Sequence, residues 1–100
     1  MAKVMVREIQ EIAEDKWQQL DGIDKKYTEL EVKMGFPPKK RYRGIIGVDM
    51  NTLVIERIYK SIAQVEELFE KANSDPEYLA LGVQLIGIML SHRLEVYLVL

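Results

Sequence analysis

The stretch that decides the fold reads Arg41-Tyr42-Arg43-Gly44-Ile45-Ile46-Gly47-Val48, Asp49-Met50-Asn51-Thr52, Leu53-Val54-Ile55-Glu56-Arg57-Ile58-Tyr59. It predicts two strands, 41–48 and 53–59, joined by a turn rich in turn-forming side chains. Helical segments follow from Ser61 and from Asp75-Pro76, and residues 94–100 close the chain as a strand. With a strand and a helix ahead of the hairpin, the order is β-α-β-β-α-β. This is the ferredoxin-like plan of an α+β domain with a four-stranded antiparallel sheet.

The three helical segments carry recognisable start and stop signals. Asp15 with Gln18, and Ser61 with Gln64, form capping-box patterns. The second helical region is predicted to break at Asp75-Pro76, with Asp75 as N-cap and Pro76 at the first helical position. We expect the last helix to run from Pro76 to about His92. The first helix has an apolar stripe at steps of three and four, formed by Trp17, Leu20, Ile23, Tyr27, Leu30 and Met34.

Apolar side chains occupy both faces of the predicted sheet. In the first strand, Val4 to about Ala13, Glu8 and Gln10 share a face with valines, so neither face is purely polar. The closing strand alternates Leu94, Val96, Leu98 and Leu100 with Tyr97 and Val99, and only Glu95 is polar. One layer of helices covers one face, and the other would expose more apolar surface than monomers tolerate. We therefore expect a homodimer, or a higher oligomer, in which a second copy covers that face.

Length and composition narrow the classes of function. One hundred residues predict a single domain, 1–100. The net charge is −2, and the only basic cluster is Lys39-Lys40-Arg41 with Arg43, so no nucleic-acid partner is expected. There is no cysteine, no apolar signal-peptide core near the amino terminus, and no uncharged run of the about 20 residues that a membrane span needs. We expect a cytoplasmic protein without a membrane partner.

The hairpin, the Tyr59-Lys60-Ser61 junction, the helix from Ser61 to Lys71, the Asp75-Pro76 turn and the final strand resemble the dimeric α/β-barrel superfamily. They are most similar to its antibiotic-biosynthesis-monooxygenase-like and NIPSNAP-like branches. The resemblance implies two four-stranded sheets that close into a barrel, with a ligand cavity between each sheet and its own helices. Some members oxidise aromatic polyketides without metal or flavin, and others degrade haem. Arg7 stands where the haem-degrading pattern has Asn, and Glu77, Tyr78 and Leu79 follow the helix break where that pattern has His, so haem use is not implied. Leu68 stands near the position of a His in the monooxygenase-like pattern.

Five residues are candidates for lining a pocket. His92, the only histidine, is predicted in the last turn of a helix, where a cation meets the helix dipole favourably; a general base or pocket donor is the alternative. Trp17 and Tyr27 are predicted as core aromatics, or as walls for a planar ligand. The hydroxyl of Tyr59 either satisfies backbone groups or orients a ligand.

Arg57 is the fifth candidate. Strand alternation places Glu56 and Arg57 on opposite faces, so one of them faces an enclosed side and needs a partner. An ion pair with Arg7, Arg43 or Glu95 is one interpretation. Recognition of an acidic or enolate-bearing ligand is the other.

Three functions follow, and the sequence does not decide whether the protein is an enzyme. The first is binding of a small apolar or aromatic ligand between sheet and helices. The second is a cofactor-independent monooxygenase that promotes substrate deprotonation and reaction of the carbanion with oxygen. The third is a structural or interaction module without catalysis. No catalytic residue is assigned, and neither a cofactor nor a metal is expected, because nucleotide-binding and zinc motifs are absent from the sequence.

Overall fold

A computed structural model describes residues 2–100, so Met1 of the predicted domain 1–100 lies outside the described residues. The elements are, in order, β1 (Val4–Ile12), a short 3₁₀ turn η1 (Glu14–Lys16), α1 (Trp17–Met34), β2 (Lys40–Arg43), β3 (Thr52–Tyr59), α2 (Ile62–Asn73), α3 (Pro76–Ile86) and β4 (Met89–Leu98). The strands form one antiparallel sheet in the order β2-β3-β1-β4. The predicted ferredoxin-like α+β fold is confirmed.

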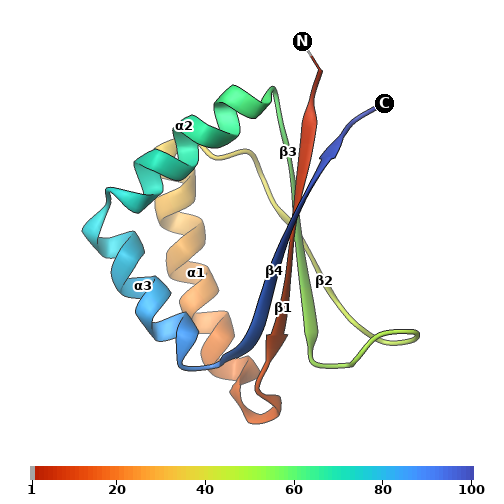
Figure 1. Cartoon of the computed structure of the whole chain (residues 1–100). Helices are drawn as coiled ribbons and strands as arrows, with labels where there is room; N and C mark the ends of the chain where they lie inside the picture. Colours follow the sequence, from red (N-terminus) through yellow and green to blue (C-terminus); the bar gives the residue numbers. More distant parts are fainter. Residues whose placement is uncertain (1) are drawn as a thin grey trace.

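All three long helices lie on one face of the sheet, and the other face carries none of them (Figure 1). Two clusters of buried side chains join the helices to that face. One is centred on Ile12, Leu53 and Leu81, and the other on Val6, Tyr59 and Leu68. The sheet therefore has a helix-covered face and a helix-free face. Within residues 2–100, no helix is both long enough and apolar enough to cross a bilayer.

Two capping side chains and one glycine fix three of the helix ends. The Ser61 hydroxyl accepts the Gln64 amide at 3.2 Å, and the Gln64 side chain accepts the Lys60 amide at 2.7 Å. The Asp75 carboxylate accepts the Tyr78 amide at 3.0 Å, so the break between α2 and α3 is confirmed. α1 ends at Gly35, whose φ of 90° suits glycine. The capping box predicted at Asp15 is wrong, because Asp15 lies in η1 and no side chain caps α1.

The second strand is shorter than predicted. The sequence suggested a strand over 41–48, but β2 ends at Arg43 and residues 44–51 form an exposed loop. Gly47 has a φ of 83°, and a Cβ at Gly44 would collide with the Asp49 carbonyl. The loop folds back on itself at these glycines, which β-branched residues cannot replace. Ile45 and Ile46 are therefore left more than 80% exposed.

The last helix and the last strand also differ from the prediction. α3 ends at Ile86 rather than near His92, and β4 begins at Met89 rather than Leu94. A short apolar run does not distinguish a buried helix from a strand, which explains the error. His92 lies on β4 opposite Gln10, so the predicted helix-capping role for His92 is wrong.

The edge strand β4 carries exposed apolar residues on the helix-covered side. The register places Leu94, Val96 and Leu98 opposite Glu8, Val6 and Val4. Paired residues of an antiparallel sheet share a face, so these three point to the same side as the helices. They are nevertheless 43–61% exposed. The helix layer therefore leaves this edge of the sheet uncovered.

Candidate functional site

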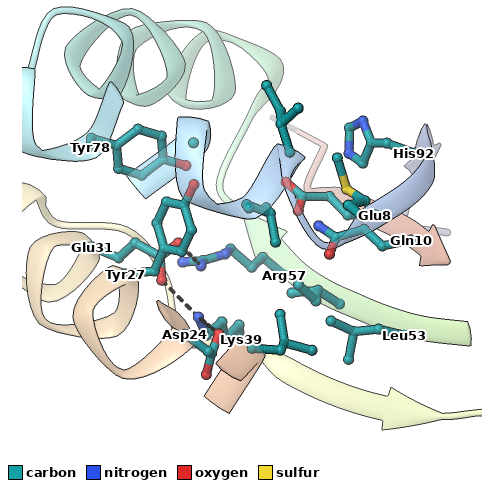
Figure 2. Close-up of a pocket in the computed structure, with 16 residues that line it drawn as sticks. Glu8, Gln10, Asp24, Tyr27, Glu31, Lys39, Leu53, Arg57, Tyr78 and His92 are labelled. Carbon is teal, nitrogen blue, oxygen red and sulfur yellow. Dashed lines mark hydrogen bonds and ion pairs between the residues drawn. The ribbon is translucent and has the colours of Figure 1, made fainter. Parts of the chain in front are cut away.

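A cavity of about 280 Å³ lies between the helices and the covered face of the sheet (Figure 2). β1, β3 and β4 form its floor, and α1, α3 and the segment before β2 form its walls. Its apolar lining comes from Leu20, Leu53, Ile55, Gly82, Leu85, Ile86 and Met89. Its polar and aromatic lining comes from Glu8, Gln10, Asp24, Tyr27, Glu31, Lys39, Arg57, Tyr78 and His92. This volume lies just below the range of about 300–1,000 Å³ typical of small-molecule pockets.

The two cations of the cavity are held by acidic side chains of α1. Arg57 contacts Glu31 at 2.6 Å and donates to the Pro37 carbonyl at 3.0 Å. Lys39 contacts Glu31 at 3.0 Å and Asp24 at 2.7 Å. Glu31 is only 8% exposed, and such a buried carboxylate needs the charges that Arg57 and Lys39 provide. The network fixes α1 against β3 and neutralises both cations.

Glu8 and Gln10 lie at the other end of the cavity, on β1. The Glu8 carboxyl makes no ion pair or hydrogen bond with the residues that the structure describes, 2–100. Loss of water around the carboxyl raises the pKa of Glu8, and attraction to His92 and Arg57 opposes this only in part. Gln10 is 4% exposed, and its Oε1 has no hydrogen-bond partner within the described part of the chain. Figure 2 shows Glu8, Gln10 and His92 grouped away from Tyr27 and Tyr78.

Two tyrosines form an aromatic wall opposite this group. The rings of Tyr27 and Tyr78 meet edge to face, with centroids 5.1 Å apart. Burial raises the pKa of Tyr27 to about 12 and raises that of Tyr78 further, so both hydroxyls keep their protons at neutral pH. A Cβ at Gly82 would lie 3.7 Å from the Tyr27 hydroxyl. Gly82 therefore leaves open the space between α3 and this wall.

The structure brings together three of the five predicted pocket residues. Tyr27, Arg57 and the exposed His92 line the cavity. Tyr59 is 2% exposed and lines a neighbouring cavity of about 140 Å³, which shares Glu8, Glu31, Arg57 and Tyr78 with the first. Burial raises the pKa of Tyr59 to about 12. Trp17 lines neither cavity: it donates to Asn51 at 3.0 Å, and the Arg43 guanidinium lies 3.9 Å from its ring.

The ion pairs near Arg57 were predicted in part. Glu56 and Arg57 point to opposite faces of the sheet, as predicted. On the helix-free face Glu56 pairs at 2.8 Å with Arg7, which was one of the predicted partners. Arg7 also lies 3.5 Å from Glu95. The partner of Arg57, however, is Glu31, which was not among the predicted partners.

Three polar cavity residues were missed, although the sequence contains a signal for each of them. Glu31 lies on the same helical face as Tyr27, four residues on, so it interrupts the apolar stripe. Glu8 and Gln10 alternate with the buried Val6 and Ile12, and were interpreted only as a sign of a sheet covered on both sides. Tyr78, whose amide is capped by Asp75, also lines the cavity, where its ring meets that of Tyr27 on α1.

No metal-binding group is apparent in the part of the chain that the structure describes. Residues 2–100 contain no group of three or more histidine, cysteine, aspartate or glutamate side chains placed to hold a metal ion. The carboxylates of Asp24 and Glu31 are already engaged by Lys39 and Arg57.

Solved structures share this fold over nearly the whole chain. A NIPSNAP family protein from Agrobacterium tumefaciens has a TM-score of 0.83 at 16% identity, over 98% of this chain and 86% of its own. A putative antibiotic biosynthesis monooxygenase from Nitrosomonas europaea has a TM-score of 0.76 at 13% identity, over 98% and 90% of the two chains. SnoaB, a cofactor-independent oxygenase from Streptomyces nogalater, has a TM-score of 0.73 at 11% identity, over 95% and 90%.

These similarities confirm the predicted fold resemblance to NIPSNAP-like and monooxygenase-like proteins. At such low identity they establish the fold alone. No protein-family model matches the sequence, and no curated protein matches it significantly.

Proposed function

We propose, from the fold shared with NIPSNAP-like and monooxygenase-like proteins, that this protein binds a small apolar or aromatic compound between its sheet and its helices. The observation that carries the proposal is the cavity of about 280 Å³, walled by Tyr27 and Tyr78 and by aliphatic side chains. The cavity opens to solvent beside the exposed Ile86 and His92, so a small molecule can enter it from that side. The volume suits one or two aromatic rings.

Filling the cavity tests this proposal. Gly82→Leu places a side chain between α3 and Tyr27, and we expect it to weaken binding of 2-naphthol and 2-methoxynaphthalene at least tenfold in fluorescence titrations. Gly22→Leu is the matched control, since Gly22 is also a helical glycine but has no atom within 4 Å of its Cβ position. Equal affinity in Gly82→Leu and Gly22→Leu would contradict the proposal, as would no binding by the wild type. Gly82→Ala serves as the milder variant if Gly82→Leu does not fold.

A cofactor-independent oxygenase is the second candidate, and Glu8 is the residue that favours it. Glu8 has no ion pair among the described residues and burial raises its pKa, which makes its carboxylate a stronger base than an exposed glutamate. In this reaction Glu8 would take the hydroxyl proton of an aromatic substrate, and the ring carbon that carries the negative charge would add O₂ to form a carbon–oxygen bond. The peroxide would take up the proton, and loss of water with the ring hydrogen would leave a quinone carbonyl. Oxygen uptake with dihydroxynaphthalenes that is lost in Glu8→Gln would support it. Wild-type inertness across a panel of naphthols and quinols would contradict it.

We further propose that the protein is a homodimer joined through the helix-free face of the sheet. This face carries the apolar side chains of Met5, Ile9, Val54 and Ile58 around the Arg7–Glu56 pair. Ile58 is 55% exposed and Tyr97, on the same face, is 42% exposed. A second copy presenting the same face would cover them by two-fold symmetry.

A further inference from the structure

The cavity contains two cations, and on charge alone it would be expected to select an acidic ligand. The hydrogen-bonding capacity of these cations is largely used inside the protein. Arg57 is engaged by Glu31 and the Pro37 carbonyl, and Lys39 by Asp24 and Glu31. Arg41 joins this network through Asp24 at 3.4 Å and Asp21 at 4.0 Å, so three positive charges face three negative ones. An anionic ligand would have to displace Glu31, which is 8% exposed and would be left buried without a partner.

Five side chains of the cavity make no side-chain hydrogen bond within residues 2–100: Tyr27, Tyr78 and His92, which can donate as well as accept, and Glu8 and Gln10. The acceptors among them that lie deepest in the sheet are on β1. Gln10 Oε1 is buried and has no hydrogen-bond partner within residues 2–100, and the Glu8 carboxylate has no ion pair there. Glu8 and Gln10 are two residues apart on β1, so their side chains point to the same face. Figure 2 shows both of them at the same end of the cavity. A buried acceptor without a donor costs free energy, which a donating ligand recovers on binding.

We propose that Glu8 and Gln10 form a hydrogen-bond-accepting subsite that selects a neutral aromatic or enolic compound with a hydroxyl group. This inference rests on the proposed ligand-binding function and deepens it. The ring of the ligand lies toward Tyr27 and Tyr78, and its hydroxyl donates to Gln10 Oε1 or to Glu8. Compounds of the same shape that lack the donor leave these acceptors unpaired, and compounds bearing a carboxylate meet the charge of Glu8.

Four naphthalenes of similar size test the proposal by fluorescence titration at pH 7. We expect 2-naphthol to bind about tenfold more tightly than 2-methoxynaphthalene, which cannot donate a hydrogen bond. We expect 2-naphthoate to bind more weakly than both. 2-Naphthylmethylamine, which carries a positive charge, tests the alternative that the Glu8 carboxylate recognises a cation rather than a hydroxyl donor.

Gln10→Leu separates this subsite from general ligand binding. We expect the variant to lose most of the preference for 2-naphthol and to keep its affinity for 2-methoxynaphthalene. Gln18→Leu, the same change at an exposed position of α1, should keep the wild-type preference. The melting temperature of Gln10→Leu gives a readout without ligand: it should equal or exceed that of the wild type, because the substitution removes an unpaired buried acceptor.

Each other outcome is decisive. Equal affinities for 2-naphthol and 2-methoxynaphthalene would overturn the accepting subsite and leave the proposed function standing. Tightest binding of 2-naphthoate would show that Arg57 and Lys39 recognise anions. Tightest binding of the amine would show that Glu8 recognises cations. Failure of all four to bind would contradict both proposals. A Gln10→Leu protein that melts several degrees lower would assign Gln10 a structural role.

Discussion

Glu8 shows how position on a strand determines the chemistry of a residue. It occupies a β1 position whose neighbours on the same face, Val6 and Gln10, are buried. At this position the carboxyl group loses water without gaining an ion pair in the described residues, and its pKa rises. An ionised Glu8 therefore costs stability at neutral pH. Residues that cost stability in the free protein are often those that serve a ligand.

Glu8→Gln should stabilise the protein at neutral pH. The pKa of Glu8 in the folded protein lies above its value in the unfolded chain, so stability falls as the pH rises through the folded pKa. The uncharged amide of the glutamine variant does not ionise, so it avoids this loss of stability. We expect Glu8→Gln to melt above the wild type at pH 7, by about 4 °C. The difference should vanish as the pH falls well below 4.5, the ordinary pKa of glutamate, because Glu8 is then protonated in both states.

The comparison needs a control for the other charged groups. His92, Arg57, Glu31 and Lys39 influence Glu8 from the surrounding elements and are the same in both proteins. Glu11→Gln, an exposed position on the same strand, should show no comparable stabilisation at pH 7. A Glu8→Gln protein that melts at or below the wild type at pH 7 would show that its carboxylate is stabilised by an interaction other than those described.

The pairing of Arg57 with Glu31 leads to a second prediction at this scale. Arg57→Met leaves Glu31 buried with only Lys39 as partner, and should lower the free energy of unfolding by about 2 kcal/mol or more. Adding Glu31→Leu should recover most of the lost free energy of unfolding, because no buried carboxylate then remains unpaired and Lys39 still contacts Asp24. Urea denaturation measures both variants. A double variant as unstable as Arg57→Met would contradict this account of the network.

At the scale of elements, α3 is a helix whose sequence partly opposes helix formation. Asp75 and Pro76 start it well, but Gly82 lies in its interior, where glycine costs up to about 1 kcal/mol relative to alanine. The same position faces Tyr27 across the cavity. Its lack of a side chain helps to keep the cavity open.

Replacing each helical glycine with alanine separates these effects. Gly82→Ala and Gly22→Ala should each raise the free energy of unfolding by about 0.5–1 kcal/mol, since neither new Cβ meets a close contact. Only Gly82→Ala should also weaken binding of 2-naphthol, because only that methyl group enters the cavity. Denaturation and fluorescence titration measure the two effects. Equal binding by both variants would show that the ligand does not occupy the space beside Gly82.

Three element ends lie where a side chain or glycine marks them, whereas the capping box expected at Asp15 does not form. Ser61, Asp75 and Gly35 have local signals, and the structure ends or begins helices at each of them. The boundary between α3 and β4 lies within a continuous apolar run, where local periodicity cannot separate helix from strand. Gly87 was the available signal for this boundary.

The whole molecule presents a sheet with helices on one face only (Figure 1). The fold was predictable because it depends on element order and on apolar periodicity, both of which are local properties. The cavity was less predictable, because it forms where Glu8, Glu31, Arg57 and Tyr78 converge from four elements. Their pairing depends on distances that the sequence pattern does not contain. The polar residues that interrupt the apolar faces of β1 and α1 were the signal in the sequence that could have indicated the cavity.

The helix-free face leads to a prediction about assembly. Ile58→Lys places a charge on this face, and we expect it to convert the proposed dimer to monomers and to remove any increase of melting temperature with protein concentration. Val32→Lys is the control, since Val32 is 72% exposed on α1, away from that face. Light scattering after size-exclusion chromatography measures the mass. A wild-type protein that is monomeric at high concentration would contradict the proposal.

The central claim is that the space between sheet and helices binds a ligand through Glu8 and Gln10. Titration of ¹⁵N-labelled protein with 2-naphthol tests it most directly. We predict that the amide shifts that change most are those of Glu8, Gln10, Tyr78, Gly82 and His92, which line the cavity. No change, or changes centred on Arg7 and Ile58 of the helix-free face, would contradict the account.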